Sequence, residues 1–126
     1  MNQIIATPNA PAAIGPYSQA VKAGNMVFVS GQLYFVPETG ELLQGTIAEQ
    51  TAQCLRNIQA ILAQAGCTMA DIVKTTIFLR DLNDFAAVNA AYAEFFPANP
   101  PARACVQVAR LPRDAAIEIE AIACRE

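Results

Sequence analysis

An arginine and a glutamate near the end of the chain have the side chains best suited to chemistry. Arg103 lies between two alanines directly after a pair of prolines, and Glu118 alternates with isoleucines in IEIE. A guanidinium presents a planar fork that matches a carboxylate. A partly buried glutamate can position a water molecule as a general base. The alternatives are a surface ion pair for Arg103 and solvent-facing carboxylates for Glu118 and Glu120.

Four further residues are candidates for the same site. The Tyr17 hydroxyl could lie at a pocket wall, or the ring could pack in a strand. Asn89 could cap the sheet with a polar group or be exposed. Gly31 directly follows the apolar segment 26–30, where another group can approach a backbone that carries no side chain. Cys105 has no evident activator for its thiol, so its backbone N–H is the more useful group.

The absence of histidine excludes several mechanisms. Ser-His-Asp and Cys-His catalysis and histidine-ligated zinc all need an imidazole. The chain has four cysteines, and none forms a C-x-x-C pair, so neither a zinc knuckle nor a disulfide framework is indicated. Proton chemistry must therefore use carboxylates, Lys, Tyr, Cys or water.

The elements that carry Arg103 and Glu118 are predicted to be two paired strands. Residues 105–108 and 117–120 alternate in the manner of half-buried strands, and residues 111–114, LPRD, have turn chemistry. This hairpin brings Arg103 and Glu118 together at one crevice. A Glu118 on the opposite face of the sheet from Arg103 would contradict that arrangement and any deamination mechanism built on it.

The rest of the chain predicts an α+β fold. Strands are expected at residues 4–6, 17–22, 26–30 and 71–79, with turns at Gly24-Asn25 and at residues 37–40. A capping box at Thr46 and Glu49 begins a helix that Gly66 ends. A second helix begins at Asn83 or Asp84 and ends before Pro97. Each helix has one apolar stripe, so both should pack on one sheet face, and the other face then needs cover.

The composition fits one domain, residues 1–126, that associates with copies of itself. Charged residues make up 15% of the chain and hydrophobic residues 54%, against roughly 25% charged in typical soluble domains. The net charge of −3 and the lack of a basic run argue against a nucleic-acid partner. The N-terminal residues do not resemble a signal peptide. No apolar run reaches the roughly 20 residues of a membrane helix, so we expect a cytoplasmic protein.

Several blocks of the sequence closely resemble the RidA (YjgF) family, over essentially the whole chain. They are NAPAAIGPY at 9–17, SGQ at 30–32, DIVKTT at 71–76, PARACV at 101–106, ARLP at 109–112 and IEIEA at 117–121. The resemblance implies a chorismate-mutase-like α+β fold with a mixed, mainly antiparallel sheet and two helices on one face. It also implies a homotrimer whose sheets line a central barrel, with three clefts between subunits.

The resemblance further implies a hydrolytic deaminase of reactive 2-imino acids, the tautomers of enamines such as 2-aminoacrylate and 2-aminocrotonate. The products are 2-oxo acids and ammonia, and neither a metal nor a cofactor is required. By this likeness Arg103 binds the substrate carboxylate, assisted by the backbone at Ala104 and Cys105, and Glu118 positions the water. The family's cleft-lining positions fall on Tyr17, Ser30, Gly31 and Asn89.

One departure from the family and two other functions stay open. The run Leu33-Tyr34-Phe35-Val36 is bulkier and more aromatic than is usual after Gly31-Gln32, so the preferred imino acid could differ. A non-catalytic trimer could instead bind a small carboxylate as a regulatory or chaperone module. A nuclease or translation inhibitor, proposed for relatives, fits poorly with an acidic chain that lacks histidine.

Overall fold

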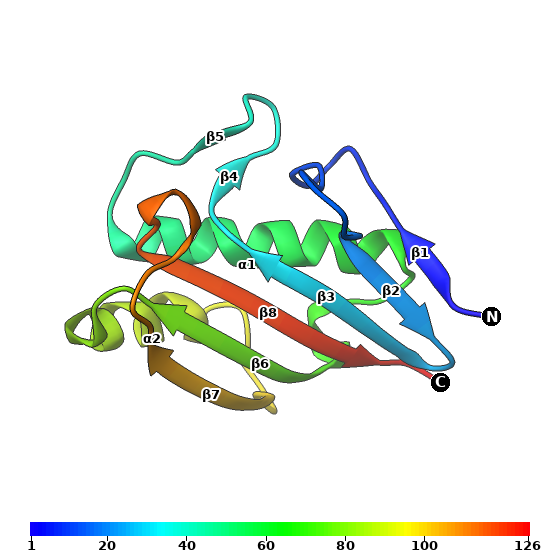
Figure 1. The fold of residues 1–126 in the computed structure, drawn as a ribbon. Coiled ribbons are helices and arrows are strands. Elements are labelled where there is room, and N and C mark those ends of the chain that lie inside the picture. Colours follow the sequence, from blue (N-terminus) through cyan, green and yellow to red (C-terminus); the bar gives the residue numbers. More distant parts are fainter.

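The computed structural model describes residues 1–126 as a twisted sheet with two helices behind it (Figure 1). Its strands are β1 Gln3–Ile5, β2 Ala20–Ala23, β3 Met26–Gln32, β6 Ile72–Leu79, β7 Ala102–Gln107 and β8 Ile117–Cys124, with a separate pair β4 Phe35–Val36 and β5 Glu41–Leu42. The helices are α1 Ile47–Gln64 and α2 Phe85–Ala93. The six-stranded sheet has the order β1-β2-β3-β8-β6-β7. Only β6 and β7 pair in parallel, so the sheet is mixed and mainly antiparallel as expected.

Local sequence signals determine where α1 begins and ends. The Glu49 backbone N–H donates to the Thr46 hydroxyl at 3.2 Å, and the Thr46 N–H donates to the Glu49 carboxylate at 2.9 Å. This is the capping box expected from the sequence, and it satisfies two backbone donors at once. Gly66 follows the last turn with φ of +79°, a left-handed conformation that glycine adopts without a Cβ penalty.

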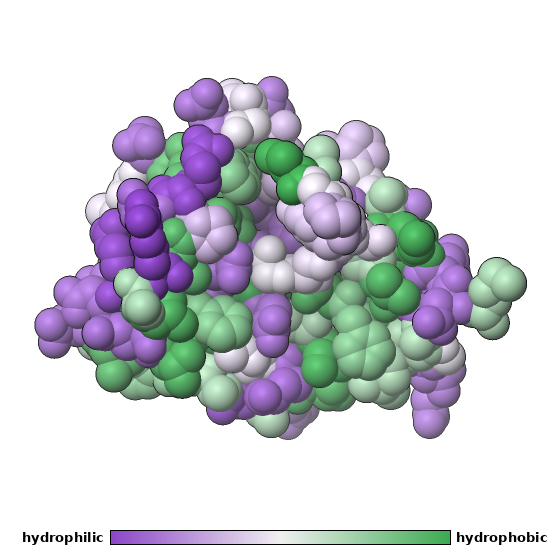
Figure 2. All heavy atoms as spheres, viewed as in Figure 1, coloured by the Kyte–Doolittle hydropathy of each residue, from purple (hydrophilic) through white to green (hydrophobic).

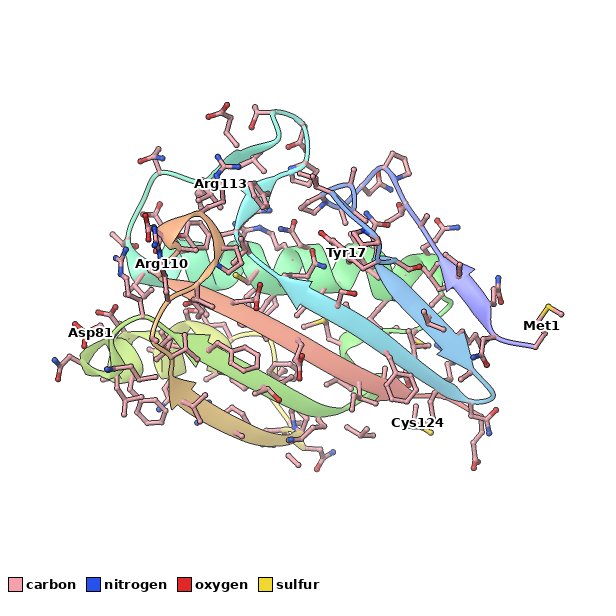
Figure 3. All side chains as sticks on the ribbon, in the orientation of Figure 1. Met1, Tyr17, Asp81, Arg110, Arg113 and Cys124 are labelled. Carbon is pink, nitrogen blue, oxygen red and sulfur yellow. The ribbon has the colours of Figure 1, made fainter.

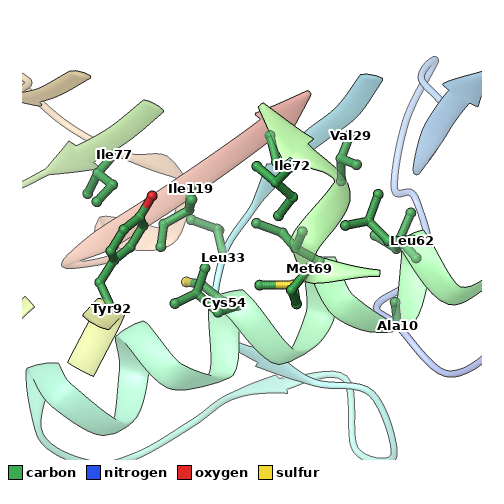
Figure 4. Packing of buried hydrophobic residues seen from close by; sticks show 14 of the residues in the cluster. Ala10, Val29, Leu33, Cys54, Leu62, Met69, Ile72, Ile77, Tyr92 and Ile119 are labelled. Atoms are coloured by element: carbon green, nitrogen blue, oxygen red, sulfur yellow. The ribbon is translucent and has the colours of Figure 1, made fainter. Parts of the chain in front are cut away.

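The core lies between the helices and one face of the sheet. The buried stripe of α1 includes Leu55, Ile58 and Leu62, and it packs against β3 and β8 (Figure 4). In β8 every second residue from Ile117 onward is buried, so its alternation is that of a strand with one covered face. Both helices therefore cover the same sheet face, as the sequence predicts.

The predicted hairpin of the two C-terminal strands is wrong. β6 lies between β7 and β8, pairing in parallel with β7 and antiparallel with β8. The turn chemistry before β8 is present as a 3₁₀ turn at Pro112–Asp114, but it leads the chain past β6 to the centre of the sheet. Burial explains this order: the fully covered residues of β8 need neighbours on both sides, whereas the mostly exposed β7 suits an edge.

Strand β2 begins later than expected, at Ala20 instead of Tyr17. The preceding residues form a loop because the buried Gln19 side chain binds several backbone groups. Its amide oxygen accepts from the Thr7 N–H at 2.7 Å, and its amide nitrogen donates to the Pro11 carbonyl at 2.7 Å. These bonds hold the proline-rich N-terminal segment against the start of β2.

The sheet face away from the helices has no cover within the chain. Figure 1 views this face with the helices behind it, and Figure 2 shows apolar side chains spread over its lower part. Large apolar side chains that remain exposed on strands of this face include Ile4, Phe28 and Val106. Contiguous exposed apolar surface is typical of a protein that associates.

Candidate functional site

Glu118 lies on the uncovered face of β8 and packs directly against Gly31 of β3. The β3–β8 register pairs Val29 with Ala121 but Gln32 with Ile119, so β3 has one extra residue at Ser30-Gly31. A Cβ on Gly31 would lie 2.9 Å from Glu118 Cδ. Bulges of this kind redirect side chains near functional sites. The expectation that another group approaches the Gly31 backbone is confirmed, and the group is the Glu118 carboxyl.

A pocket of about 370 Å³ opens in front of Glu118 and Gly31. Its other walls come from the loop before β2, the segment after β3 and the turn before β8, and Figure 3 shows Tyr17 and Arg113 on two of these segments. Tyr17 lines this pocket and precedes β2, so it is a wall residue and not a strand residue, and its hydroxyl accepts the Ile14 N–H at 3.3 Å. The twelve lining residues are Pro11, Ala12, Ile14, Tyr17, Gln19, Gly31, Gln32, Leu33, Phe35, Pro112, Arg113 and Glu118.

The electrostatic environment makes Glu118 a better base than an ordinary surface glutamate. Burial raises the pKa of its carboxyl, and the negative charge of Glu120 raises it further. Both effects disfavour the charged form. A carboxylate with a raised pKa accepts a proton from water more readily, which is what general base catalysis near neutral pH requires.

Ser30 supports this pocket without lining it. Its hydroxyl donates to the Ser18 carbonyl at 2.6 Å, and its backbone N–H donates to the Gln19 carbonyl at 2.9 Å. These bonds tie the loop that carries Tyr17 to the end of β3. The sequence did not predict that Gln19 holds the N-terminal segment in place. The one signal for this role was a polar residue at the expected position of a strand.

The bulky run after Gly31-Gln32 divides between the pocket and the core. Leu33 and Phe35 line the pocket, so part of this departure from the family does border the site. Tyr34 is buried instead, and its hydroxyl accepts the Ala116 N–H at 2.9 Å. Arg113, which sequence reasoning also missed, has its guanidinium 5.4 Å from the centre of the Phe35 ring.

Arg103 lies in a second hollow, of about 560 Å³, between β7 and α2. Its guanidinium is exposed but held: Nη1 donates to the Asn89 side-chain oxygen at 2.7 Å. The rings of Phe85 and Tyr92 lie 5.5 Å and 5.0 Å from its central carbon. Asn89 is therefore neither a cap over the sheet nor simply exposed, but a partner of Arg103.

Arg103 and Glu118 do not converge within one chain, and that expectation is wrong. In register, Arg103 pairs with Thr75 of β6 and Glu118 pairs with Phe78. Positions 75 and 78 of one strand are three residues apart and point to opposite faces. Arg103 therefore faces the helices, whereas Glu118 faces the uncovered side. The sequence could not show this because it did not reveal that β6 separates the two strands.

The flanking residues of β7 follow the same alternation. Ala104 is exposed on the uncovered face, and Cys105 is half-buried on the helix face beside Arg103. Burial raises the pKa of the Cys105 thiol, an effect that the positive charge of Arg103 only partly offsets. Cys105 is thus a poor nucleophile at neutral pH. All four cysteines are free thiols.

No group of three or more His, Cys, Asp or Glu side chains is placed to hold a metal ion. No helix combines the length and the apolar character needed to cross a membrane.

Comparison with known proteins gives a consistent result over the whole chain. Residues 7–125 match the family described as Endoribonuclease L-PSP. The 2-iminobutanoate/2-iminopropanoate deaminase of Escherichia coli K12 is 57% identical over 128 aligned positions, covering 99% of each chain. A putative endoribonuclease from Thermotoga maritima superposes with a TM-score of 0.98 at 52% identity, covering 100% of this chain and 99% of its own. Escherichia coli TdcF with bound serine superposes with a TM-score of 0.94 at 50% identity, covering 98% and 99%.

Proposed function

The chain belongs to the Endoribonuclease L-PSP family, also called the RidA (YjgF) family, and from this premise we propose that it hydrolyses 2-imino acids. It is a 2-iminobutanoate/2-iminopropanoate deaminase, the name borne by a relative 57% identical over nearly the whole chain. The products are a 2-oxo acid and ammonia. The observation that carries the proposal is the half-buried Glu118, whose pKa is raised and whose carboxyl faces an open pocket.

The active site is composite, with Arg103 from one copy of the chain and Glu118 from another. Two observations support this: the two side chains lie on opposite faces of one sheet, and the face that carries Glu118 has no cover within the chain and exposes large apolar side chains. Docking the Arg103 edge of one copy beside the Glu118 pocket of the next is a heterologous contact, which gives a closed ring when the rotation between successive copies closes. A homotrimer with three clefts between subunits meets this requirement.

Arg103 is suited to bind the substrate carboxylate. A guanidinium has five N–H donors, and Asn89 is its one hydrogen-bond partner in the chain. The remaining donors are free to form a charge-assisted fork with a carboxylate. Because β7 is a sheet edge, backbone N–H groups of its residues also point away from β6. The amide of Cys105, next to Ala104, is the proposed second donor to the carboxylate.

Glu118 acts on the water that attacks the imine. Its carboxylate accepts a proton from that water as the oxygen bonds to C2, which gives a tetrahedral carbinolamine. Starting from the protonated imine, Glu118 then returns this proton to the nitrogen and accepts the hydroxyl proton of the carbinolamine as the C–N bond breaks, so that ammonia leaves and the C2–O bond becomes a carbonyl. General base catalysis by a carboxylate that holds the water in place accelerates such a reaction by about 10²–10⁴-fold. Tyr17 and Gly31 form the wall and floor of the cleft beside this carboxylate.

The other two functions receive less support. With a net charge of −3 and no histidine, the chain lacks both the overall positive charge that favours phosphate binding and the usual general base of a ribonuclease, so we propose no nucleic-acid partner. A non-catalytic carboxylate-binding module would need Arg103 but not a glutamate with a raised pKa in a pocket. The cytoplasmic location stays a prediction.

A coupled assay tests the proposal. A threonine dehydratase generates the imine of 2-oxobutanoate, and its decay is followed with and without the protein. We expect faster decay, with the acceleration lost in both Arg103→Ala and Glu118→Gln. Decay at the buffer rate, together with calorimetric binding of 2-oxobutanoate, would instead identify the non-catalytic module.

A further inference from the structure

The guanidinium of Arg103 is surrounded by aromatic side chains that no step of the deamination uses. Arg103 lies on an edge strand and is exposed, and a long side chain at such a place ordinarily samples many rotamers. Here the rings of Phe85 and Tyr92 lie 5.5 Å and 5.0 Å from its central carbon. Both distances are within the range of a cation–π contact.

The Tyr92 ring is itself fixed in position. Its hydroxyl bonds to the Thr75 hydroxyl at 2.7 Å, and both residues are buried. Thr75 is the register partner of Arg103 across the β6–β7 ladder, so the bond anchors the tyrosine beside the arginine. The Phe96 ring packs against the Tyr92 ring, with the two centroids 4.6 Å apart. Burial raises the pKa of Tyr92, so its hydroxyl stays protonated and keeps the bond to Thr75.

Asn89 restricts the rotation of the Arg103 guanidinium in its own plane. Phe85, Asn89 and Tyr92 follow at spacings of four and three residues on α2, so they form one face of that helix. The Asn89 side-chain oxygen accepts from Nη1 of Arg103 at 2.7 Å. The two rings restrict where the guanidinium lies, and this bond restricts how it is rotated in its plane.

We propose that Phe85 and Tyr92 are positioning residues for the reaction: with Thr75 behind Tyr92, they hold the Arg103 guanidinium ready for the substrate carboxylate. This inference rests on the proposed function for its role in catalysis. The arrangement reduces the side-chain freedom that Arg103 loses when it binds a carboxylate, because most of that freedom is already lost in the free protein. It acts on binding and not on the proton transfer at Glu118.

The variant Phe85→Leu tests this with little risk to the fold, because Phe85 is 37% exposed. A cation–π contact at an exposed site corresponds to a change of about two- to fivefold in affinity. We expect the KM for the imine and the calorimetric Kd for 2-oxobutanoate each to rise by about that factor, with kcat unchanged. Phe85→Tyr, which keeps the ring, should restore the wild-type values. Leu82→Ala, an exposed apolar residue on the preceding turn, is the matched control and should change nothing.

A second measurement does not depend on activity. In nitrogen-15 NMR, the Nε–Hε order parameter of Arg103, assigned with Arg103→Lys, should be high in the wild type and lower in both Phe85→Leu and Thr75→Val. A mobile Arg103 in the wild type, or equal order in all variants, would overturn the inference. So would an unchanged Kd in Phe85→Leu. An ordered Arg103 in a wild-type protein that does not hydrolyse imines would leave the positioning intact and contradict only the proposed function.

Discussion

Replacing Gly31 with alanine should lower deaminase activity without lowering stability. The new Cβ would lie 2.9 Å from Cδ and 3.0 Å from Oε1 of Glu118. Carbon atoms pack at about 3.5–4.0 Å, so the carboxyl must retreat by roughly 0.6 Å or more. A displacement approaching 1 Å at a reacting group costs up to about a hundredfold in rate. We therefore expect kcat to fall by about ten- to a hundredfold.

Stability should not fall, because the obstructing atoms belong to the end of a flexible side chain. Gly31 has no positive φ, and an alanine in such a conformation reduces the freedom of the unfolded chain, which stabilises by about 0.4–1 kcal/mol. Urea unfolding of the variant should give an equal or higher midpoint. The coupled imine assay measures the activity of the same preparation.

Gly24→Ala is the matched control with the opposite signature. Gly24 has φ of +60° and no atom within 4 Å of its ideal Cβ, and it lies in the β2–β3 turn at the other end of β3. A left-handed alanine costs about 1–2 kcal/mol, so this variant should be less stable and fully active. Full activity in Gly31→Ala would refute the argument that the position of the Glu118 carboxyl determines the rate.

Two further predictions concern pH and the helix cap. Catalysis needs Glu118 as the carboxylate, and burial and Glu120 raise its pKa, so kcat/KM should fall as the pH drops through this raised pKa. Glu120→Gln should move this acid limb to lower pH, and an unmoved limb would count against the assigned cause. Thr46→Ala removes the hydroxyl that accepts the Glu49 N–H and should cost about 1 kcal/mol in urea unfolding. Its activity per folded molecule should equal that of the wild type.

Features set by local chemistry could be read from the sequence. The capping box at Thr46, the left-handed Gly66 and the two-residue turn at Gly24-Asn25 each depend on a few adjacent residues. The close approach to Gly31 was also predictable, because a glycine in a strand leaves room for a neighbour. Its partner, Glu118, was already a candidate on other grounds.

The pairing of the strands could not be read in the same way. Alternation shows which residues of β8 are buried, but it does not show which strand lies beside β8. The sequence therefore placed Arg103 and Glu118 on neighbouring strands, whereas β6 separates them and puts them on opposite faces. Gln19, Tyr92 and Arg113 were missed because their roles depend on partners far away in the sequence.

The most direct test of the composite site is complementation between two inactive variants. Arg103→Ala and Glu118→Gln are prepared separately, unfolded, mixed in equal amounts and refolded together. If each site takes Arg103 from one copy and Glu118 from the next, random assembly restores about a quarter of the sites, so about a quarter of wild-type activity should return. A mixture as inactive as either variant, although the oligomers have exchanged subunits, would contradict the shared site.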